Sequence, residues 1–535
     1  MSTKKKQSFL GGAAILASAV AIVKILGAVY KIPFGNIVGP EGQTYFNVAY
    51  NIYNVLLTIS TAGLPLAISK LTSQAHTQGR ENQKRKIFST AIWLFFAMGL
   101  VGTLLMFFGA ERLAAFMNEP LGYWPIRALS PAVFCVCLLA CMRGYTQGQG
   151  NMTPTAVSQI LEALCKLGLG LMLAWYFLKL GLGLDIAAAG AILGVTAGTF
   201  LSLLYLIFYL LRHRDRRTSL DEPDSGGKLM RQILAIGIPI TLSNSAMSII
   251  TLVDTKIVLG RLREIPALAD SAAELFGQYT FGMNLINLPP SFVFPVTMSL
   301  IPFAAAALTR RDHAEAGRII SSGFRLVAVL TIPAGVGLSV VGGPALLMLY
   351  PKRQADALAA GPHMRWLGIA CIFMCLMNLT NVILQTYGKE LIPIWTVIAG
   401  GVTKVVMNYI LVGNPSINIH GAPISTLMCY VVIVGLNLFF VWKYSPEKPR
   451  YLQIFAKPVI ASALMGGGAW AVYGFMSRAL SGHSAYGANA VATLCGILAG
   501  VIVYAVLVVA LRILRAEDLK TVPHGAKLAK LLHLR

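Results

Sequence analysis

Residues 487–511 read GANAVATLCGILAGVIVYAVLVVAL and contain no charged side chain. A helix needs about 20 consecutive apolar residues to cross the hydrocarbon core of a bilayer, and this run is long enough. It lacks the strict alternation of polar and apolar residues that a half-buried strand shows. The run therefore predicts a transmembrane helix.

Thirteen further apolar stretches lie upstream of this run, each bounded by polar or Gly- and Pro-rich breaks. They fall at residues 9–32, 44–69, 87–109, 122–142, 155–178, 184–211, 232–260, 275–308, 319–343, 363–386, 391–412, 418–442 and 452–476. Together the stretches predict fourteen transmembrane helices, and hence an all-α polytopic membrane protein.

The composition agrees with a chain that lies mostly within a bilayer. Hydrophobic residues make up 56% and charged residues 12% of the 535 residues. Soluble domains carry about 25% charged residues, so a water-soluble enzyme is excluded. The eight cysteines form no CxxC pair, the eight histidines show no HExxH spacing, and no nucleophile constellation appears. We expect no enzymatic activity, no cofactor and no metal site.

The charged residues predict how the chain is oriented. The net charge of +23 arises from 44 Lys and Arg against 21 Asp and Glu. With Lys4, Lys5 and Lys6 placed in the cytoplasm, the basic residues concentrate on that side, as the positive-inside rule requires. The asymmetry predicts two cytoplasmic termini, and it explains the charge without nucleic-acid binding. The longest break, 212–231, is the expected cytoplasmic linker.

The two halves of the sequence carry the same landmarks in the same order, which indicates an internal repeat. The matched pairs include Lys31 and Lys256, Asn54 and Asn284, Pro65 and Pro295, Arg127 and Arg365, and Lys166 and Lys404. Because each copy has an even number of helices, six, the copies are parallel and related by an axis along the membrane normal. The expected domains are an N-terminal lobe at 1–218, a C-terminal lobe at 219–446, and the last two helices with a tail at 447–535.

Several charged residues fall inside the apolar stretches, where a charge at the centre of a helix costs about 2.5–3.5 kcal/mol. The cations are Lys24, Lys31, Arg127, Lys166, Lys256 and Lys404, and the acids are Glu162 and Asp254. This surplus of cations points to a cavity for an anion. Glu162 and Lys166 stand at i and i+4 and are expected to pair. For Lys31, Arg127 and Lys256, an interfacial position is the alternative.

Neutral polar residues repeat at helical spacing beside these charges. One helix face within residues 44–69 carries Asn47, Asn51, Asn54, Thr58 and Thr61. Further stripes consist of Asn244, Ser248, Thr251 and Thr255; of Asn284, Asn287 and Ser291; and of Asn378, Asn381 and Gln385. The stripes favour a hydrated central cavity, and hydrogen bonds between packed helices are the alternative. Pro65 and Pro295 predict bends at equivalent points of the two halves.

Three short segments resemble a known superfamily. They are KILG at 24–27, GLPLAISK at 63–70 and QGQGN at 147–151. With fourteen spans in two six-helix lobes, the chain resembles the polysaccharide-transporter branch of the MOP (multidrug/oligosaccharidyl-lipid/polysaccharide) exporter superfamily, and within it the group of stage V sporulation protein B and the lipid II flippases.

The resemblance implies a V-shaped pair of lobes that opens alternately to each side of the membrane and moves lipid-linked sugar precursors outward. It implies that basic residues of the cavity hold the pyrophosphate. Lys24 stands where such flippases carry an arginine, and Lys31 stands where they tend to carry an acid. In that group, the last two helices form a groove for the lipid tail.

We therefore expect a flippase for an undecaprenyl-pyrophosphate-linked sugar precursor, either lipid II or another cell-envelope glycan. Lysines supply point charges for phosphate oxygens, and polar side chains suit sugar hydroxyls. The candidate substrate-binding residues are Lys24, Lys31, Asn47, Asn51, Asn54, Arg127, Lys166, Lys256, Asn284 and Lys404. Membrane lipid and H⁺ or Na⁺ are the other expected partners, with Glu162 and Asp254 as candidate ion-coupling residues.

Two other functions stay open on the sequence alone. A cation-coupled multidrug exporter of the same superfamily needs cavity carboxylates, which Glu162 and Asp254 would supply. A non-transporting membrane scaffold for envelope synthesis should tolerate loss of the intramembrane charges but not changes in the basic loops.

Cysteine labelling tests the predicted orientation. Glu222→Cys lies in the linker and should stay unlabelled by a membrane-impermeant thiol reagent added to intact cells. Gln354→Cys lies between the stretches 319–343 and 363–386, outside the cell, and should be labelled. The unchanged chain gives the background of the native cysteines. The reverse pattern would overturn the predicted orientation.

Overall fold

The computed structural model describes residues 9–213 and 219–514. Lys4–Lys6, three basic linker residues (Arg214, Arg216 and Arg217) and the tail 515–535 lie outside the described residues. The described residues form helices without a strand, which confirms the predicted all-α class. The chain divides into two compact units, Met1–Gly260 and Arg261–Arg535. The lobe boundaries at 218 and 446 stay a prediction.

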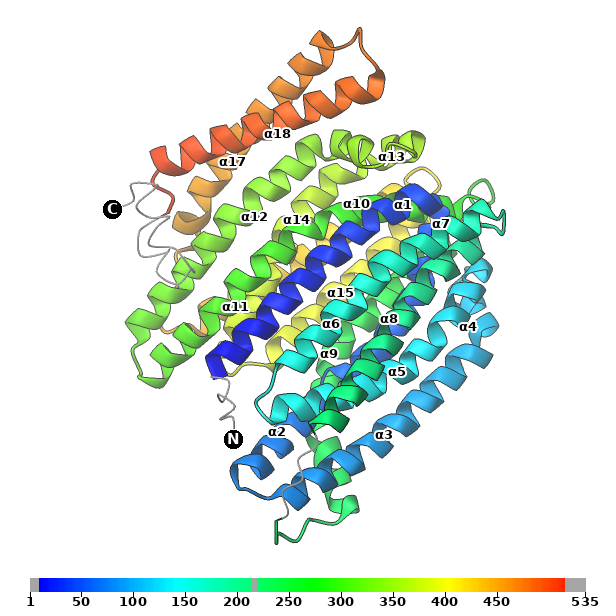
Figure 1. Cartoon of the computed structure of the whole chain (residues 1–535). Helices are drawn as coiled ribbons and strands as arrows, with labels where there is room; N and C mark the ends of the chain where they lie inside the picture. The colour runs from blue at the N-terminus through cyan, green and yellow to red at the C-terminus, as the bar shows by residue number, and fades with distance from the viewer. Residues whose placement is uncertain (1–8, 214–218, 515–535) are drawn as a thin grey trace. The chain divides into compact units, whose positions relative to one another are not determined.

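The first unit is built from α1 to α9 (Figure 1). Their bounds are α1 Phe9–Thr61, α2 Leu64–Thr77, α3 Glu81–Phe108, α4 Ala110–Phe116, α5 Tyr123–Gly148, α6 Thr153–Cys165, α7 Leu171–Lys179, α8 Leu184–Arg212 and α9 Gly226–Arg263. A π-helical turn, Lys166–Gly170, joins α6 to α7, and the last residues of α9 belong to the second unit.

The second unit contains the remaining helices. Their bounds are α10 Ala272–Ile286, α11 Leu288–Thr309, α12 His313–Leu349, α13 Gln354–Ala360, α14 His363–Thr386, α15 Leu391–Val412, α16 Gly421–Tyr444, α17 Tyr451–Ala479 and α18 Ala485–Ala510. The last two, α17 and α18, pack against each other and against α12 (Figure 1).

The long helix α1 contains two of the predicted spans. Its backbone leaves the helical region at Gly39, where φ is 72° and ψ is −172°, and Pro33 and Pro40 lie nearby. Glycine adopts a positive φ without steric cost, and Pro40 has no backbone N–H to donate to a helix. The break expected between 9–32 and 44–69 is therefore a sharp kink rather than a loop.

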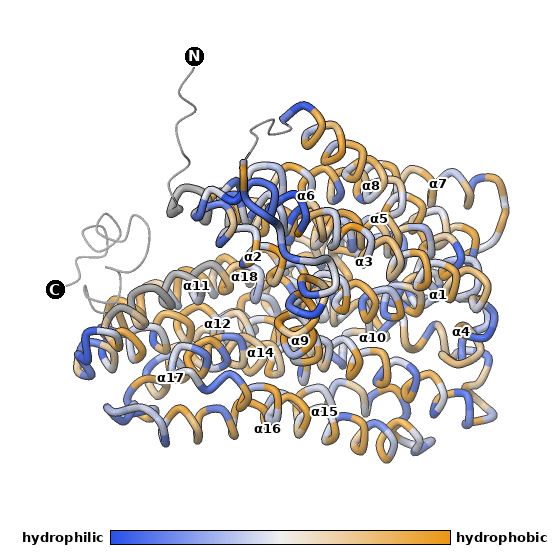
Figure 2. Tube along the Cα trace, turned by 90° about the horizontal axis from the view of Figure 1, so that it is seen from below, coloured by the Kyte–Doolittle hydropathy of each residue, from blue (hydrophilic) through white to orange (hydrophobic). Residues whose placement is uncertain are grey.

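The number of spans differs from the expectation. Within the described residues, eleven helices are long and apolar enough to cross a membrane, or up to twelve if a bent pair counts as one span. The predicted count of fourteen is not confirmed. One source of the difference is that Ser18–Thr77 counts once although it is kinked at Gly39. Figure 2 shows hydrophobic residues along the helices and hydrophilic ones mainly at their ends, as a bilayer requires.

Prolines interrupt the helices near both predicted bends. In the first half, α1 ends at Thr61 and Pro65 lies in the first turn of α2, at the predicted place. In the second half, the break between α10 and α11 lies at Asn287, just before Pro289 and Pro290, which have no backbone N–H to donate. The helix α11 continues through residue 295, and a bend at Pro295 stays a prediction.

The linker folds onto the start of α3. The two carboxylate oxygens of Asp221 accept from the backbone N–H groups of Asn82 and Gln83, at 3.0 and 2.8 Å. First-turn N–H groups have no partner within their own helix, so Asp221 acts as a cap supplied from far along the chain. Lys228 donates to Asp224 at 2.7 Å, and this bond holds the pKa of the Asp224 carboxyl below its usual range.

A buried polar network joins three helices of the second unit. Asn437 of α16 accepts from Thr396 of α15 at 2.7 Å and donates to Asn381 and Thr380 of α14 at 2.7 and 3.0 Å. Asn381 belongs to a stripe that was expected to line a cavity. For this residue the structure supports the alternative, a hydrogen bond between packed helices.

Replacing Asn437 tests this network. Asn437→Leu leaves Thr396 and Asn381 without their partner, and an unsatisfied buried polar group costs about 1–3 kcal/mol. We expect a lower free energy of unfolding, measured as a lower thermal unfolding midpoint in detergent. Leu436→Ala, on the exposed side of the same helix, is the control and should change little. Equal midpoints for Asn437→Leu and the unchanged chain would contradict a structural role.

Candidate functional site

Lys166 lies in the middle of a membrane-spanning segment. It opens the π-helical turn between α6 and α7, thirteen residues from either end of the run Thr153–Lys179. At a rise of 1.5 Å per residue, this corresponds to about 20 Å of helix on each side. Short π-helical turns frequently occur at functional sites. The ammonium group is therefore far from both predicted interfaces.

Small residues of α8 hold the π-helical turn in place. Gly194 faces the backbone of Gly170 and Gly198 faces the backbone of Glu162, in both cases where a Cβ would have no room. Small residues let transmembrane helices approach closely. The segment that carries Glu162 and Lys166 is thus pressed against α8.

Three aromatic rings surround the Lys166 ammonium, and we call Tyr30, Phe46 and Tyr50 the aromatic cage. The Lys166 Nζ lies 4.4 Å from the ring centre of Tyr50, 5.0 Å from that of Tyr30 and 5.5 Å from that of Phe46. The kink at Gly39 folds Tyr30 back onto Phe46, with ring centres 6.0 Å apart. Each cation–π contact contributes about 0.5–2 kcal/mol, so the rings partly replace water around the charge.

A second cation lies near the cage. Lys31 is half-buried, and its ammonium repels that of Lys166 electrostatically. Gln43 donates to the backbone oxygen of Lys31 at 3.4 Å. Within residues 9–213 and 219–514, neither lysine forms an ion pair with a carboxylate. Two like charges without a carboxylate partner among the described residues leave this part of the first unit with an excess of positive charge.

Glu162 pairs with Arg143 rather than with Lys166, so the predicted i, i+4 pair is wrong. The distance from Arg143 Nη2 to Glu162 Oε2 is 3.1 Å, and Arg143 Nε donates to Ser158 at 2.9 Å. The fork of a guanidinium binds two acceptors at once, which a lysine does less well. Sequence reasoning missed Arg143 because the apolar stretch ends at 142, whereas α5 continues to Gly148.

The polar stripe on α1 faces the stripe on α9. Asn51 donates to Thr255 at 2.9 Å, and the Thr58 and Ser248 hydroxyls lie 2.9 Å apart. Between these contacts is a cleft of about 130 Å³, lined by Asn51, Asn54, Met247, Ser248 and Thr251. Both interpretations of the stripes therefore apply here, because the same residues hold helices together and line a polar space.

The cage and the polar cleft occupy neighbouring faces of one helix. Phe46 and Tyr50 are four residues apart, and Asn47 and Asn51 follow each of them by one position. One residue turns an α-helix by about 100°. A ligand that reaches Lys166 is therefore close to the amides of the cleft. The side chain of Asn244, expected in the stripe on α9, is outside the described part.

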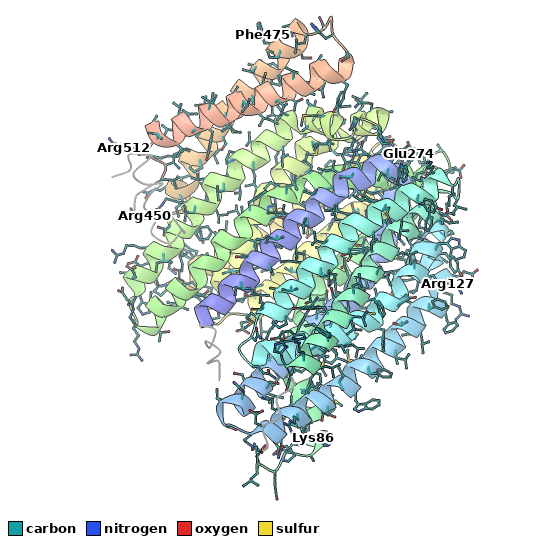
Figure 3. All side chains as sticks on the ribbon, in the orientation of Figure 1. Lys86, Arg127, Glu274, Arg450, Phe475 and Arg512 are labelled. Atoms are coloured by element: carbon teal, nitrogen blue, oxygen red, sulfur yellow. The ribbon has the colours of Figure 1, made fainter. Side chains whose placement is uncertain are left out.

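Two predicted cations lie among aromatic rings at helix ends. The Lys256 Nζ lies 3.5 Å from the ring centre of Phe116, and Asn118 donates to the Lys256 backbone oxygen at 3.2 Å. The Arg127 guanidinium lies 4.4 Å from the ring centre of Phe107 and donates to the Tyr123 hydroxyl. Figure 3 shows Arg127 at the end of the first unit that carries α4. These contacts support the interfacial alternative for both residues.

The remaining candidates are dispersed. In the first unit, Lys24 is exposed and Asn47 half-buried on α1, and Asp254 is buried on α9 beside Thr255. In the second unit, Lys404 is half-buried on α15. Asn284 is buried on α10, and its Nδ2 has no partner among the described residues.

Two curated relatives cover most of the chain. Stage V sporulation protein B of Bacillus subtilis (strain 168) is 24% identical over 527 residues, which are 97% of this chain and 98% of that protein. Lipid II flippase MurJ of the same strain is 25% identical over 475 residues, or 85% of this chain and 87% of that protein.

Solved structures share the fold at 16% sequence identity. Lipid II flippase MurJ in an inward closed conformation matches with a TM-score of 0.68, over 93% of this chain and 100% of that chain. An inward-facing multidrug resistance MATE family transporter of the MOP superfamily matches with a TM-score of 0.62, over 81% and 98%.

These matches confirm the resemblance carried by the segments at 24–27, 63–70 and 147–151, and the chain is a multi-pass membrane protein. The family model described as "Polysaccharide biosynthesis protein" matches residues 9–307, which is more than half of the sequence. The chain therefore belongs to the polysaccharide biosynthesis protein family.

Proposed function

We propose that this chain is a flippase that moves an undecaprenyl-pyrophosphate-linked sugar precursor, lipid II or another cell-envelope glycan, from the inner to the outer leaflet by alternating access. The observation that carries the proposal is Lys166, a mid-span cation near Lys31 that forms no ion pair with a carboxylate of the described residues. A charge in a low-dielectric interior is stabilised strongly by an opposite charge. The flippase named among the relatives supports the same substrate class.

The aromatic cage would hold Lys166 until the substrate arrives. Cation–π contacts contribute about 0.5–2 kcal/mol, and hydrogen bonds between charged groups about 1.5–3 kcal/mol. The rings of Tyr30, Phe46 and Tyr50 carry no net charge, so a pyrophosphate adds a Coulomb attraction to the ammonium that the rings do not supply. The flexible stem of lysine lets its ammonium follow the phosphate without a change in the helix.

The neighbouring cleft suits the sugar part of such a substrate. Asn51, Asn54 and Thr251 present amide and hydroxyl groups at its wall. Sugar hydroxyls both donate and accept hydrogen bonds, which these side chains can match. We propose that the substrate also contacts Lys24, Asn47, Asn284 and Lys404 along its path through the protein. We assign Arg127 and Lys256 to the membrane–water interface.

The proposed orientation follows from the charge distribution. Both termini and the linker lie in the cytoplasm, in a bacterial plasma membrane, because the basic residues concentrate on that side. We expect the substrate to enter from the inner leaflet, where the basic cytoplasmic loops attract its negatively charged pyrophosphate.

The alternatives have weaker support. In a cation-coupled drug exporter, free carboxylates would bind the cationic drug, but Glu162 is already paired with Arg143. A non-transporting scaffold gives no reason for an uncompensated lysine at mid-span. Transport of an anionic lipid rather than a cationic dye separates the three functions.

Removing the charge of Lys166 tests the proposal directly. Lys166→Gln keeps length and polarity, and the loss of one charge-assisted hydrogen bond should slow flipping about tenfold or more. Lys166→Arg should retain part of the rate. The measurement is flipping of a labelled lipid-linked pyrophosphate precursor in proteoliposomes. Lys179→Gln, at the end of α7 beside Trp175, is the matched control and should flip normally.

Companion variants decide between the functions. Normal flipping by Lys24→Gln, Lys166→Gln and Lys404→Gln would overturn the anion site. Export of a cationic dye that depends on Glu162 would identify a drug exporter. Loss of function only after changes in the basic loops would identify a scaffold.

Ion coupling is proposed to run through Asp254 or Glu162. Asp254→Asn should remove any dependence of the flipping rate on a H⁺ or Na⁺ gradient, because it leaves no titratable group at a buried position of α9. Glu162→Gln leaves Arg143 unpaired, so it should also lower the thermal midpoint. The double variant Arg143→Gln with Glu162→Gln restores neutrality and separates the loss of stability from the loss of coupling. An unchanged ion dependence in both single variants would refute this assignment.

A further inference from the structure

An open groove lies in the second unit, and none of the candidate substrate-binding residues lines it. It has a volume of about 350 Å³ and lies between α12, α13, the start of α14 and α17. Figure 1 shows α13 beside the end of α12, on the side along which α17 runs. The residues that line the groove include Ser339, Gly343, Pro344, Gly361, Arg365 and Tyr473.

Small residues keep this groove open. Gly343 of α12 and Gly361 of the α13–α14 turn face each other, so that a Cβ on Gly343 would touch the Gly361 backbone. Pro344 lies beside them, and its backbone oxygen accepts from Asn489 of α18 at 3.0 Å. Backbone and small residues thus form part of the wall, Val340, Leu347 and Leu358 add apolar side chains, and contacts with the C-terminal helix pair hold the wall.

Arg365 supplies the charge of the groove. Its side chain is exposed, and its backbone oxygen accepts from the Ser339 hydroxyl at 3.1 Å. Among the described residues, its guanidinium makes no ion pair, hydrogen bond or ring contact. The other polar group of the wall, the Tyr473 hydroxyl, is engaged by Asn489 at 3.1 Å. The guanidinium is therefore the free binding group.

The predicted repeat offers a comparison for the unpaired Arg365 guanidinium. Arg127 is the matched residue of the first half, and its guanidinium is occupied by the Phe107 ring and the Tyr123 hydroxyl. Both arginines lie in the first turns of their helices, α5 and α14, and their surroundings differ. Position alone therefore does not explain why Arg365 remains unengaged beside an open groove.

The surroundings of the groove fit a membrane interface. Trp366, next to Arg365 on α14, and Trp470, on α17, are exposed, and tryptophan concentrates where the hydrocarbon meets the headgroups. Lys352 and Arg353 stand at the turn before α13 and add positive charge. The acid of this turn, Asp356, accepts from Gln278 at 3.3 Å.

We propose that this groove binds an anionic phospholipid, with the lipid phosphate on the Arg365 guanidinium and an acyl chain along the apolar walls. A guanidinium binds phosphate oxygens through two parallel hydrogen bonds, and this arrangement favours a phosphate over a neutral group. The positive neighbours favour a lipid with net negative charge over a zwitterionic lipid. The groove shares no lining residue with the surroundings of Lys31 and Lys166, and the inference does not depend on the proposed flippase activity.

Lipid binding by the purified full chain tests the site. Native mass spectrometry in detergent would measure binding of dioleoyl phosphatidylglycerol and of dioleoyl phosphatidylcholine, with undecaprenyl phosphate as a third probe. We expect the unchanged chain to prefer phosphatidylglycerol. Arg365→Gln should weaken that binding about tenfold and leave phosphatidylcholine binding unchanged, and Arg365→Lys should retain part of the preference.

Matched controls separate the groove from general charge effects. Arg478→Gln removes a cation from the same helix as Tyr473 but outside the groove, and Arg127→Gln removes the repeat mate, so both should keep the preference for phosphatidylglycerol. Thermal midpoints with and without each lipid provide a second readout.

Three outcomes would overturn the proposal. They are no preference for phosphatidylglycerol in the unchanged chain, an unchanged preference in Arg365→Gln, and an equal loss in Arg478→Gln. If Arg365→Gln loses binding of undecaprenyl phosphate but not of phosphatidylglycerol, the groove serves the lipid carrier and the phospholipid assignment is wrong.

Discussion

An ammonium group in the middle of a membrane span must be solvated by something other than bulk water, and in this chain three aromatic rings do so. The rings around Lys166 stabilise its charge but do not neutralise it, since a ring carries a quadrupole and no net charge. The ammonium therefore keeps its positive charge, as the proposed anion site requires. A carboxylate in the same place would have cancelled that charge.

The backbone holds the Lys166 ammonium against the three aromatic rings. The kink at Gly39 folds α1 back on itself, so that Tyr30 and Phe46, from the two halves of one helix, meet at the same ammonium. On the other side, Gly194 and Gly198 of α8 support the π-helical turn that carries Lys166. Glu162, one turn away, is held by Arg143 and is thereby kept from neutralising the lysine. The cation site thus results from close helix packing as much as from the lysine itself.

The sequence predicts the parts of this arrangement that depend on one helix at a time. Apolar runs identify the membrane-spanning stretches, and the 3- and 4-residue spacing of Asn47, Asn51 and Asn54 identifies a polar face. Partners on different helices escape such reasoning. The pairing of Glu162 with Arg143 depends on where α5 ends, and the break at Asn287 falls inside the apolar stretch 275–308, which predicted a single helix. The aromatic cage could have been suspected from Phe46 and Tyr50 at i and i+4, but their contact with Lys166 required the kink at Gly39.

The internal repeat predicts equivalent positions, and the structure shows that equivalent positions carry different surroundings. Lys31 lies near a second cation, whereas its mate Lys256 lies over the ring of Phe116. Arg127 is enclosed by aromatic groups, whereas Arg365 faces an open groove. A match in sequence landmarks does not fix the surroundings of a side chain, because these are set by neighbours from other helices. Residues matched by the predicted repeat therefore have chemically distinct surroundings in one chain.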